Sequence, residues 1–289
     1  MVRIWVMAAR LRTLPAAIAP VLVGTSLART EGTFRAGAFV AALLGAIFIQ
    51  VGTNLSNDYS DARRGADTED RLGPVRVTAG GLVPPRQVLI ATYVTFGLAV
   101  VCGAYLVYVA GPALLAIGAA SILAGVLYTG GPRPYGYEGL GEVFVFLFFG
   151  IVAVTGSYFV QVESLEWEAF ALAVPVGLLA AAILVVNNVR DIDTDRRAGK
   201  LTLAMRLGRQ RARTLYSLML LVAYVVLIAV VFPLSAWVLL PVVTLPLAAR
   251  LARTVRAHVD GPTLNAALAQ TGMLQLVFCV LLSVGILAS

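Results

Sequence analysis

The sequence predicts an all-α, multi-pass membrane protein whose 289 residues form a single domain, 1–289. Of these residues 60% are hydrophobic and only 13% are charged, and the mean hydropathy is +0.89. A soluble domain carries about 25% charged residues, so this chain has too few to cover a water-facing surface. Long apolar runs recur along the chain, and the basic residues are concentrated between alternate runs. Together these observations predict a bundle of membrane-spanning helices.

Nine apolar runs are expected to cross the bilayer, since a helix needs roughly 17–25 residues to span about 30 Å of hydrocarbon. The first and eighth runs are short and contain prolines, which neighbouring helices accommodate in a membrane. The expected spans are 13–28, 36–56, 88–109, 113–129, 141–161, 169–189, 214–232, 234–249 and 263–288. An odd number of spans places the two termini on opposite sides of the membrane.

The positions of the basic residues predict the orientation. All but two of the 22 arginines and lysines lie before the first span or after an even-numbered span, including the segment that follows the eighth span. Only Arg29 and Arg35 lie on the other side, where the connection between spans five and six carries Glu163, Glu166 and Glu168. The positive-inside rule then predicts a cytoplasmic N-terminus and an extracytoplasmic C-terminus.

Residues 1–12 are expected to form an interfacial segment on the inner leaflet. They intersperse arginines with Ile4, Trp5, Met7 and Leu11, and they lack the uninterrupted apolar core and cleavage site of a signal peptide.

Composition argues against several kinds of function. The net charge of +7 is confined to loops between apolar runs, which favours a lipid surface and argues against a nucleic-acid partner. Cys102 and Cys279 lie in apolar stretches without a second ligand nearby in the sequence, so they are interpreted as core residues. His258 is the only histidine, which excludes a cluster of histidine metal ligands.

Two acidic segments, 54–70 and 187–195, follow spans two and six. If each span continues as a helix for one or two turns beyond the membrane, an Asn and two Asp in each segment share one face. These residues are Asn54, Asp58 and Asp61 in the first segment, and Asn187, Asp191 and Asp195 in the second.

The two segments resemble each other and begin 133 residues apart, with four spans from one to the next. An even number of crossings returns the chain to the same side, so the segments are expected to face each other at the mouth of a central, cytoplasm-facing cavity. Facing carboxylates repel unless a cation lies between them. Because Mg²⁺ is typically held by one or two carboxylates and substrate phosphate oxygens, the pattern predicts a site for a Mg²⁺-bound diphosphate.

Neutral and basic residues beside the carboxylates suit the same ligand. Asn54 and Asn187 are candidates to coordinate the metal or orient the carboxylates. Lys200, the only lysine, follows the second acidic segment, where a compact charge suits a phosphate, although its position is also compatible with chance. The alternative for both segments is that juxtamembrane acids and bases pair with each other in water.

At these residues the sequence resembles the UbiA superfamily of intramembrane aromatic prenyltransferases, and within it the branch that acts on 1,4-dihydroxy-2-naphthoate in menaquinone synthesis. The similar stretches are 12–20, 54–67, 71–76, 128–134, 140–142 and 187–203. Several superfamily members carry the third acid of the first motif nearer the position of Gly65, whereas this chain has Asp67.

The resemblance implies a Mg²⁺-dependent enzyme of the bacterial inner membrane. Its substrates would be a polyprenyl diphosphate and 1,4-dihydroxy-2-naphthoate, and the products demethylmenaquinol, CO₂ and diphosphate. The implied metal ligands are Asp58, Asp61, Asp67, Asp191 and Asp195. The implied substrate contacts are Asn54, Asn187, Arg71, Arg76, Tyr128, Arg133, Arg190 and Lys200. Tyr128 is a candidate for a cation–π contact with the allylic cation, or for an interfacial anchor. The aromatic residues of span five are candidates to line the isoprenoid tail.

Three alternatives remain at this point. The first alternative, within the superfamily, is an enzyme whose aromatic acceptor is 4-hydroxybenzoate or homogentisate. Outside it, an ion-coupled transporter would also show repeats, but transporters place ionisable groups near the membrane midplane, which is nearly free of charge here. A CDP-alcohol phosphotransferase would carry its acids in one segment with a different spacing.

Overall fold

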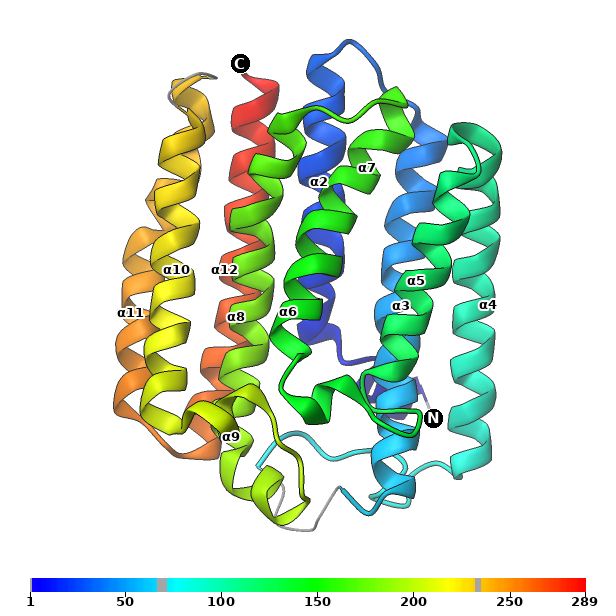
Figure 1. Ribbon diagram of the computed structural model, residues 1–289, viewed down its shortest axis with the longest axis vertical. Helices are drawn as coiled ribbons and strands as arrows, with labels where there is room; N and C mark the ends of the chain where they lie inside the picture. The colour runs from blue at the N-terminus through cyan, green and yellow to red at the C-terminus, as the bar shows by residue number, and fades with distance from the viewer. Residues whose placement is uncertain (1, 67–71, 232–234) are drawn as a thin grey trace.

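The computed structural model describes residues 2–66, 72–231 and 235–289. This part of the chain contains helices and no strand, which confirms the all-α prediction. Seven uninterrupted helices run along the long axis in Figure 1: α2 (Leu14–Thr30), α3 (Ala36–Arg63), α4 (Pro85–Ala110), α5 (Ala113–Leu127), α8 (Trp167–Arg197), α10 (Arg209–Val231) and α12 (Gly261–Leu287).

Two further stretches change helix type along their length. In the first, α6 (Gly141–Phe146) continues through the π-helical η3 (Leu147–Val152) into α7 (Ala153–Val162). In the second, the 3₁₀ helix η4 (Ala236–Thr244) contains Pro241 and continues into α11 (Leu245–Ala257). Short helices complete the fold: α1 (Val2–Ala9), η1 (Leu11–Thr13), η2 (Tyr135–Glu138) and α9 (Leu203–Leu207).

Each expected span falls on one of these helical stretches, but the count of nine crossings stays a prediction. Eight stretches in the described part of the chain are long and apolar enough to cross a membrane. The ninth, α5, has 15 residues, which is short for a bilayer core that takes roughly 17–25.

Three helices extend beyond the ends expected from hydropathy. α3 and α8 continue to Arg63 and Arg197, so residues 54–63 of the first acidic segment and all of 187–195 lie on helix, as the shared-face argument required. α11 ends at Ala257, beyond the expected end of the span at residue 249, and Arg250, Arg253 and Arg256 lie on the helix. These arginines are exposed, while Ala248, Leu251 and Val255 are buried on the opposite face. Hydropathy misses such an extension because an amphipathic turn averages to a polar value.

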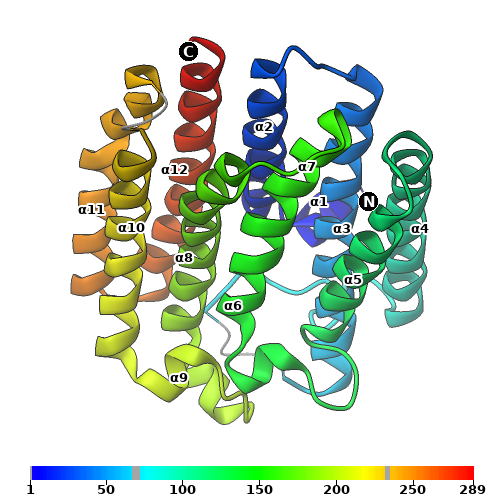
Figure 2. The same cartoon turned by 45° about the horizontal axis from the view of Figure 1, so that its top comes forward.

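α1 is a separate helix and does not continue α2 (Figure 2). Arg10 adopts a left-handed backbone conformation, with φ 53° and ψ 63°, which ends α1 and redirects the chain into η1. Ile4, Trp5 and Met7 pack beside a small buried cluster formed by Ala8, Leu55, Val77, Val83 and Val88. The N-terminal segment is therefore attached to α3 and to the connection before α4.

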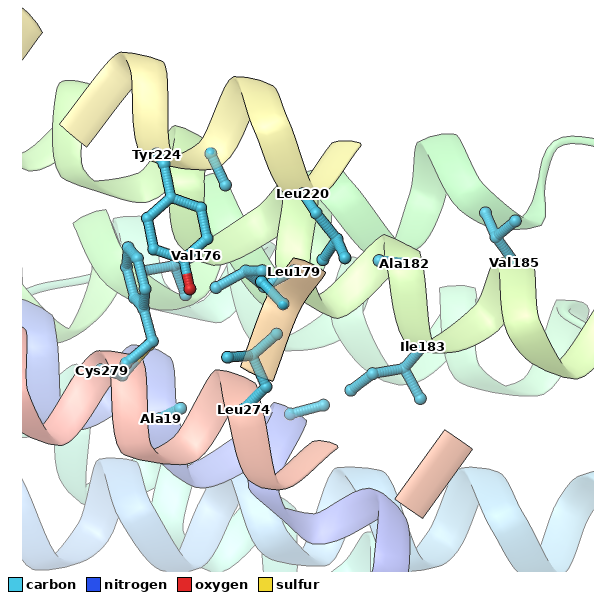
Figure 3. Packing of buried hydrophobic residues seen from close by; sticks show 14 of the residues in the cluster. Ala19, Val176, Leu179, Ala182, Ile183, Val185, Leu220, Tyr224, Leu274 and Cys279 are labelled. Atoms are coloured by element: carbon cyan, nitrogen blue, oxygen red, sulfur yellow. The ribbon is translucent and has the colours of Figure 1, made fainter. Parts of the chain in front are cut away.

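The core is built around α8, whose apolar residues are buried along most of its length. Figure 3 shows Val176, Leu179 and Ala182 of α8 beside Leu220 and Tyr224 of α10 and Leu274 of α12. Gly150 lets η3 approach α8 closely, because a Cβ added at Gly150 would lie 2.5 Å from the Gly177 Cα atom. Such small residues allow membrane helices to pack closely without a hydrophobic driving force.

The two acidic segments lie at the same end of the bundle. In Figure 1 the C-terminal ends of α3 and α8 and the short helix α9 are at the bottom, and the C-terminus of α12 is at the top. This arrangement agrees with an even number of crossings between the acidic segments.

Candidate active site

The helices enclose a cavity of about 510 Å³ that begins among polar side chains and continues between apolar ones. The helices α2, α3, α4, α5 and α8 and the α6–α7 stretch contribute to its wall. On α3 the lining residues extend from Ala42 to Asp61, which corresponds to about 28 Å along the helix axis. The cavity can therefore accommodate a long molecule with one polar and one apolar end.

Both acidic segments contribute to the polar end of this cavity. Its lining includes side chains from α3, from α8 and from the connections that follow them: Asn54, Asn57, Asp61, Arg76, Asn187, Asn188, Asp191, Asp195 and Lys200. The sequence-based expectation that the two segments meet at one mouth is confirmed.

Asp61 is the centre of the polar network. Its carboxylate accepts hydrogen bonds from Arg76 Nη2 at 3.1 Å, from Lys200 Nζ at 3.3 Å and from the Tyr137 hydroxyl at 2.6 Å. The side chain is only 2% exposed, so its charge needs these partners to offset the loss of hydration. Lys200 Nζ also lies 4.8 Å from the centroid of the Tyr137 ring. Two cations and a hydroxyl thus converge on one carboxylate that faces the cavity.

Asp58 has different surroundings, although it lies on the same helix. Its two carboxylate oxygens accept hydrogen bonds from the backbone amides of Val77 and Thr78, at 3.0 and 2.8 Å. Asp58 is buried and does not line the cavity. Its contacts hold the segment that delivers Arg76 to Asp61, which differs from the metal-ligand role that the sequence implied.

Arg190 and Asp191 form a buried pair at the start of the second segment. Arg190 Nε and Nη2 donate to the two Asp191 oxygens at 2.7 and 2.5 Å. Arg190 also donates to Asn187 Oδ1 at 2.9 Å and to Asn265 Oδ1 of α12 at 2.5 Å. Because Asp191 lines the cavity and Arg190 does not, Arg190 acts on the site by orienting Asp191 and Asn187.

The other predicted residues divide into three groups. Asn54 and Tyr128 line the cavity, and Asn54 Nδ2 donates to the Ala9 carbonyl oxygen at 3.0 Å and to Thr13 Oγ1 at 3.1 Å. Arg133 is exposed and does not contribute to the lining. Asp67 and Arg71 lie outside the described residues.

The site could hold a divalent cation through its hard oxygen donors. Asp61, Asp191, Asp195 and the Asn57 and Asn187 amides contribute to one cavity end, with Arg76 and Lys200 beside them. Within the described ranges, no three carboxylates are close enough to hold a metal by themselves. This arrangement fits Mg²⁺, which binds with one or two carboxylates and completes its shell with phosphate oxygens and water.

Aromatic rings form the wall just beyond the polar end. Tyr128 meets Tyr135 edge-on with ring centroids 5.5 Å apart, and Tyr135 stacks on Phe144 at 4.0 Å. Burial raises the pKa of Tyr135, so its hydroxyl stays protonated and donates to the Ala124 carbonyl oxygen at 2.9 Å. Phe148 continues the row, with its centroid 6.1 Å from that of Phe144.

The π-helical turn keeps one side of the α6–α7 stretch directed at the cavity. The lining residues recur every four positions: Phe144, Val145, Phe148, Phe149, Val152, Ala153, Gly156, Ser157 and Val160. A regular α-helix repeats every 3.6 residues, so residues 16 positions apart would face nearly opposite directions. The wider π turn compensates for this drift, which is consistent with the frequent location of such turns at functional sites.

Exposed apolar side chains of α4 and α5 contribute to the apolar end of the cavity. Val100 of α4 and Leu115 and Ile117 of α5 line it and are 57%, 68% and 37% exposed. A lateral opening to lipid, expected for an enzyme with an isoprenoid substrate, stays a prediction.

Sequence reasoning missed several residues of the site. Asn57 lines the cavity and accepts a hydrogen bond from Thr129 Oγ1 at 2.8 Å. Glu142 is buried and accepts from Asn188 Nδ2 at 2.8 Å. Asn57 and Asn188 are adjacent to Asp58 and Asn187 in the two motifs, so this adjacency was the available signal. Tyr137 and Arg10 gave no such signal, because only the fold brings them to the carboxylates and the cavity.

Comparison with known proteins supports the interpretation. The chain matches the model of the UbiA prenyltransferase family over residues 17–278. The 1,4-dihydroxy-2-naphthoate octaprenyltransferase of Mycobacterium tuberculosis is 44% identical over 276 residues, covering 96% of this chain and 94% of that protein. The protein of the same name in Escherichia coli is 38% identical over 275 residues, covering 92% of this chain and 89% of that one.

Solved structures share the fold. A UbiA homologue from Archaeoglobus fulgidus bound to GPP and Mg²⁺ has a TM-score of 0.69 at 14% identity, covering 99% of this chain and 100% of its own. An apo UbiA homologue from Aeropyrum pernix K1 has a TM-score of 0.71 at 16% identity, covering 96% and 98%. At such identities the likeness concerns the fold alone, whereas the family match and the closer relatives cover almost the whole sequence. This chain belongs to the UbiA prenyltransferase family.

Proposed function

We propose that this protein transfers a polyprenyl group from polyprenyl diphosphate to 1,4-dihydroxy-2-naphthoate, with loss of CO₂ and diphosphate, to give demethylmenaquinol. The observation that carries the proposal is the single cavity that joins carboxylates, Arg76 and Lys200 at one end to a long apolar wall at the other. Relatives at 44% and 38% identity bear the name of this activity. Membership of a prenyltransferase family also argues against the ion-coupled transporter and the phosphotransferase.

The diphosphate is expected to bind at the polar end. Mg²⁺ bound with Asp61, Asp191 and Asp195 would neutralise the charge that develops on the leaving diphosphate. Arg76 and Lys200 contact Asp61 in the free protein. When the diphosphate binds, both are expected to exchange this carboxylate for phosphate oxygens. Both cations then favour cleavage of the bond between the allylic carbon and the diphosphate oxygen, because they stabilise the negative charge of the departing group.

Asp58 is proposed to position this machinery and not to bind the metal. Its oxygens hold the backbone of Val77 and Thr78, next to Arg76 in the chain. A carboxylate that accepts two buried amide hydrogen bonds would lose both if it turned towards the cavity.

The aromatic row is expected to shield the reacting carbon from water. Tyr128 and Phe144 line the cavity beyond the carboxylates, where a ring face can stabilise an allylic cation by a cation–π contact. A ring carbon of the acceptor forms the new bond, and the acceptor carboxylate leaves as CO₂. The isoprenoid tail is expected to extend along the apolar wall formed by α3 and α5.

The test of the reaction is prenyl transfer in membranes that contain the expressed protein. Labelled polyprenyl diphosphate is supplied with 1,4-dihydroxy-2-naphthoate, 4-hydroxybenzoate or homogentisate, with Mg²⁺ or excess EDTA. Transfer only to the naphthoate, with release of CO₂ and loss of activity in EDTA, is expected. Transfer to 4-hydroxybenzoate alone would contradict the acceptor, and full activity in EDTA would contradict the metal requirement.

The protein is also proposed to span the bacterial inner membrane with the polar end of the cavity at the cytoplasm. The basic residues at the end of α8, in α9 and at the start of α10 support this orientation, which follows the positive-inside rule. Reporter fusions after Ser289 and at Arg209, the first residue of α10, are expected to give opposite results, with the former extracytoplasmic. Reporters on the same side would contradict an odd number of crossings.

A further inference from the structure

Asn265 of α12 connects the two acidic segments of the site from outside the cavity. Its Oδ1 accepts a hydrogen bond from Arg190 Nη1 at 2.5 Å, and its Nδ2 donates to the Leu72 carbonyl oxygen at 2.8 Å. An amide side chain accepts and donates at the same time, which an ionised carboxylate cannot do. Asn265, Arg190 and Leu72 do not line the cavity. A substrate can therefore bind without displacing any member of this bridge.

On one side the bridge reaches a carboxylate of the site through Arg190. The Arg190 side chain is 2% exposed, and it also donates to both Asp191 oxygens and to Asn187 Oδ1. Asp191 and Asn187 line the cavity. Because the guanidinium donors lie in one rigid plane, a hydrogen bond that fixes Nη1 also fixes the direction of the donors that hold Asp191. Asn265 thus acts on Asp191 through Arg190.

On the other side the bridge reaches the connection between α3 and α4. Leu72 lies in this connection, and Arg76 follows four residues later. The start of α12 packs on Leu72, since a Cβ added at Gly261 would lie 3.2 Å from the Leu72 Cβ. The two backbone amides that follow Arg76 are held by Asp58. Arg76 is therefore positioned between an attachment to α12 and an attachment to α3.

Other contacts between the two segments involve groups that the substrate is expected to engage. Lys200 Nζ contacts Asp61 at 3.3 Å and so joins the connection after α8 to α3. In the proposed reaction Lys200 and Arg76 leave Asp61 for phosphate oxygens, so these contacts change when the diphosphate binds. Facing carboxylates also repel each other until a cation lies between them. The Asn265 bridge opposes this separation in the free and in the bound protein.

We propose that Asn265 is a positioning residue that holds Arg76 and Asp191 at a fixed separation for one Mg²⁺-bound diphosphate, an inference that rests on the proposed function. Ligands that are already in place bind without the free-energy cost of ordering them. Residues that orient metal ligands from behind typically change metal affinity or activity by about 10- to 100-fold when they are replaced.

The test measures binding without the transfer reaction. The purified protein is titrated calorimetrically with inorganic pyrophosphate in the presence of Mg²⁺. Asn265→Leu removes both hydrogen bonds at similar side-chain volume and is expected to raise the Kd of pyrophosphate about 10- to 100-fold. In the transfer assay the same variant should raise the KM for polyprenyl diphosphate by a similar factor, and the KM for the aromatic acceptor less than about threefold.

Asn265→Asp separates the two arms of the bridge. The new carboxylate still accepts from Arg190, so the buried guanidinium keeps all its partners, but it cannot donate to the Leu72 carbonyl oxygen. This variant is expected to raise the Kd of pyrophosphate about 10-fold or more, and it serves as the test if Asn265→Leu does not fold. The neutral leucine in turn shows that a new negative charge is not the cause of the loss.

Gln275→Met is the matched control on the same helix. The Gln275 side chain is buried, and its Nε2 donates to the Val176 carbonyl oxygen of α8 at 3.4 Å. This contact also joins α12 to α8, but it lies ten residues beyond Asn265, towards the end of α12 that is opposite the acidic segments (Figure 1). The variant is expected to leave the Kd and both KM values within about twofold of wild type, even if thermal stability falls.

Three results would overturn the proposal. An unchanged Kd in Asn265→Leu, or an equal rise in Gln275→Met, would remove the positioning role of Asn265 while the proposed function stands. A wild-type Kd in Asn265→Asp would place the effect on the Arg190 arm alone and remove the bridge. If the wild-type protein itself does not bind pyrophosphate with Mg²⁺, the proposed diphosphate site fails, and the role of Asn265 fails with it.

Discussion

Asp61→Asn is expected to lower kcat by about a thousandfold or more while the protein stays folded. The substitution keeps the shape of the side chain but removes the charge that faces the cavity and pairs with Arg76 and Lys200. Asparagine can still accept a hydrogen bond from Tyr137, which limits the structural damage. The measurement is Mg²⁺-dependent prenyl transfer by purified protein, with thermal unfolding in detergent to confirm folding.

Two other aspartates serve as comparisons for Asp61. Asp193→Asn alters an exposed carboxylate that pairs with Arg209 and should change the rate less than about twofold. Asp58→Ala should mainly lower the thermal stability, because two buried amides lose their acceptor, and the remaining activity should keep the wild-type dependence on Mg²⁺ concentration. If Asp58→Ala needed a higher Mg²⁺ concentration than the wild type and Asp61→Asn did not, the assigned roles would be reversed.

Asp191→Ala is expected to destabilise the fold by about 3–5 kcal/mol and to abolish transfer. The variant leaves the guanidinium of Arg190, 2% exposed, without the carboxylate that receives two of its hydrogen bonds. The double variant Arg190→Met with Asp191→Leu removes both charges and should recover most of the stability but none of the activity.

Thermal unfolding and transfer assays on the two variants separate the structural from the chemical role of Asp191. An active double variant would place Asp191 outside the reaction. Wild-type stability in Asp191→Ala would show that the ion pair does not hold this end of α8.

The sequence by itself determined the class of the protein, the course of its helices and the meeting of the acidic segments. Hydropathy locates apolar runs because each must be long enough to bury its backbone in hydrocarbon, and this rule acts within one segment. Each acidic segment places an Asn and two Asp on one helix face, which predicted two polar faces at one end of the helix bundle. These residues are Asn54, Asp58 and Asp61 in the first segment and Asn187, Asp191 and Asp195 in the second. Helical periodicity is a local property, so both predictions needed no knowledge of the neighbouring helices.

Only the tertiary structure decided what each residue of the site does. Asp58 and Asp61 are nearly equivalent in sequence, yet Asp58 meets the backbone of Val77 and Thr78 and Asp61 meets the cavity. Arg133 lies in the stretch 128–134, which is similar to the naphthoate branch, but its side chain is exposed. Arg10 lines the cavity and follows α1 in a left-handed backbone conformation. The reason is that connections between helices are positioned by packing and hydrogen bonds from residues distant in the chain, and no local pattern encodes those partners.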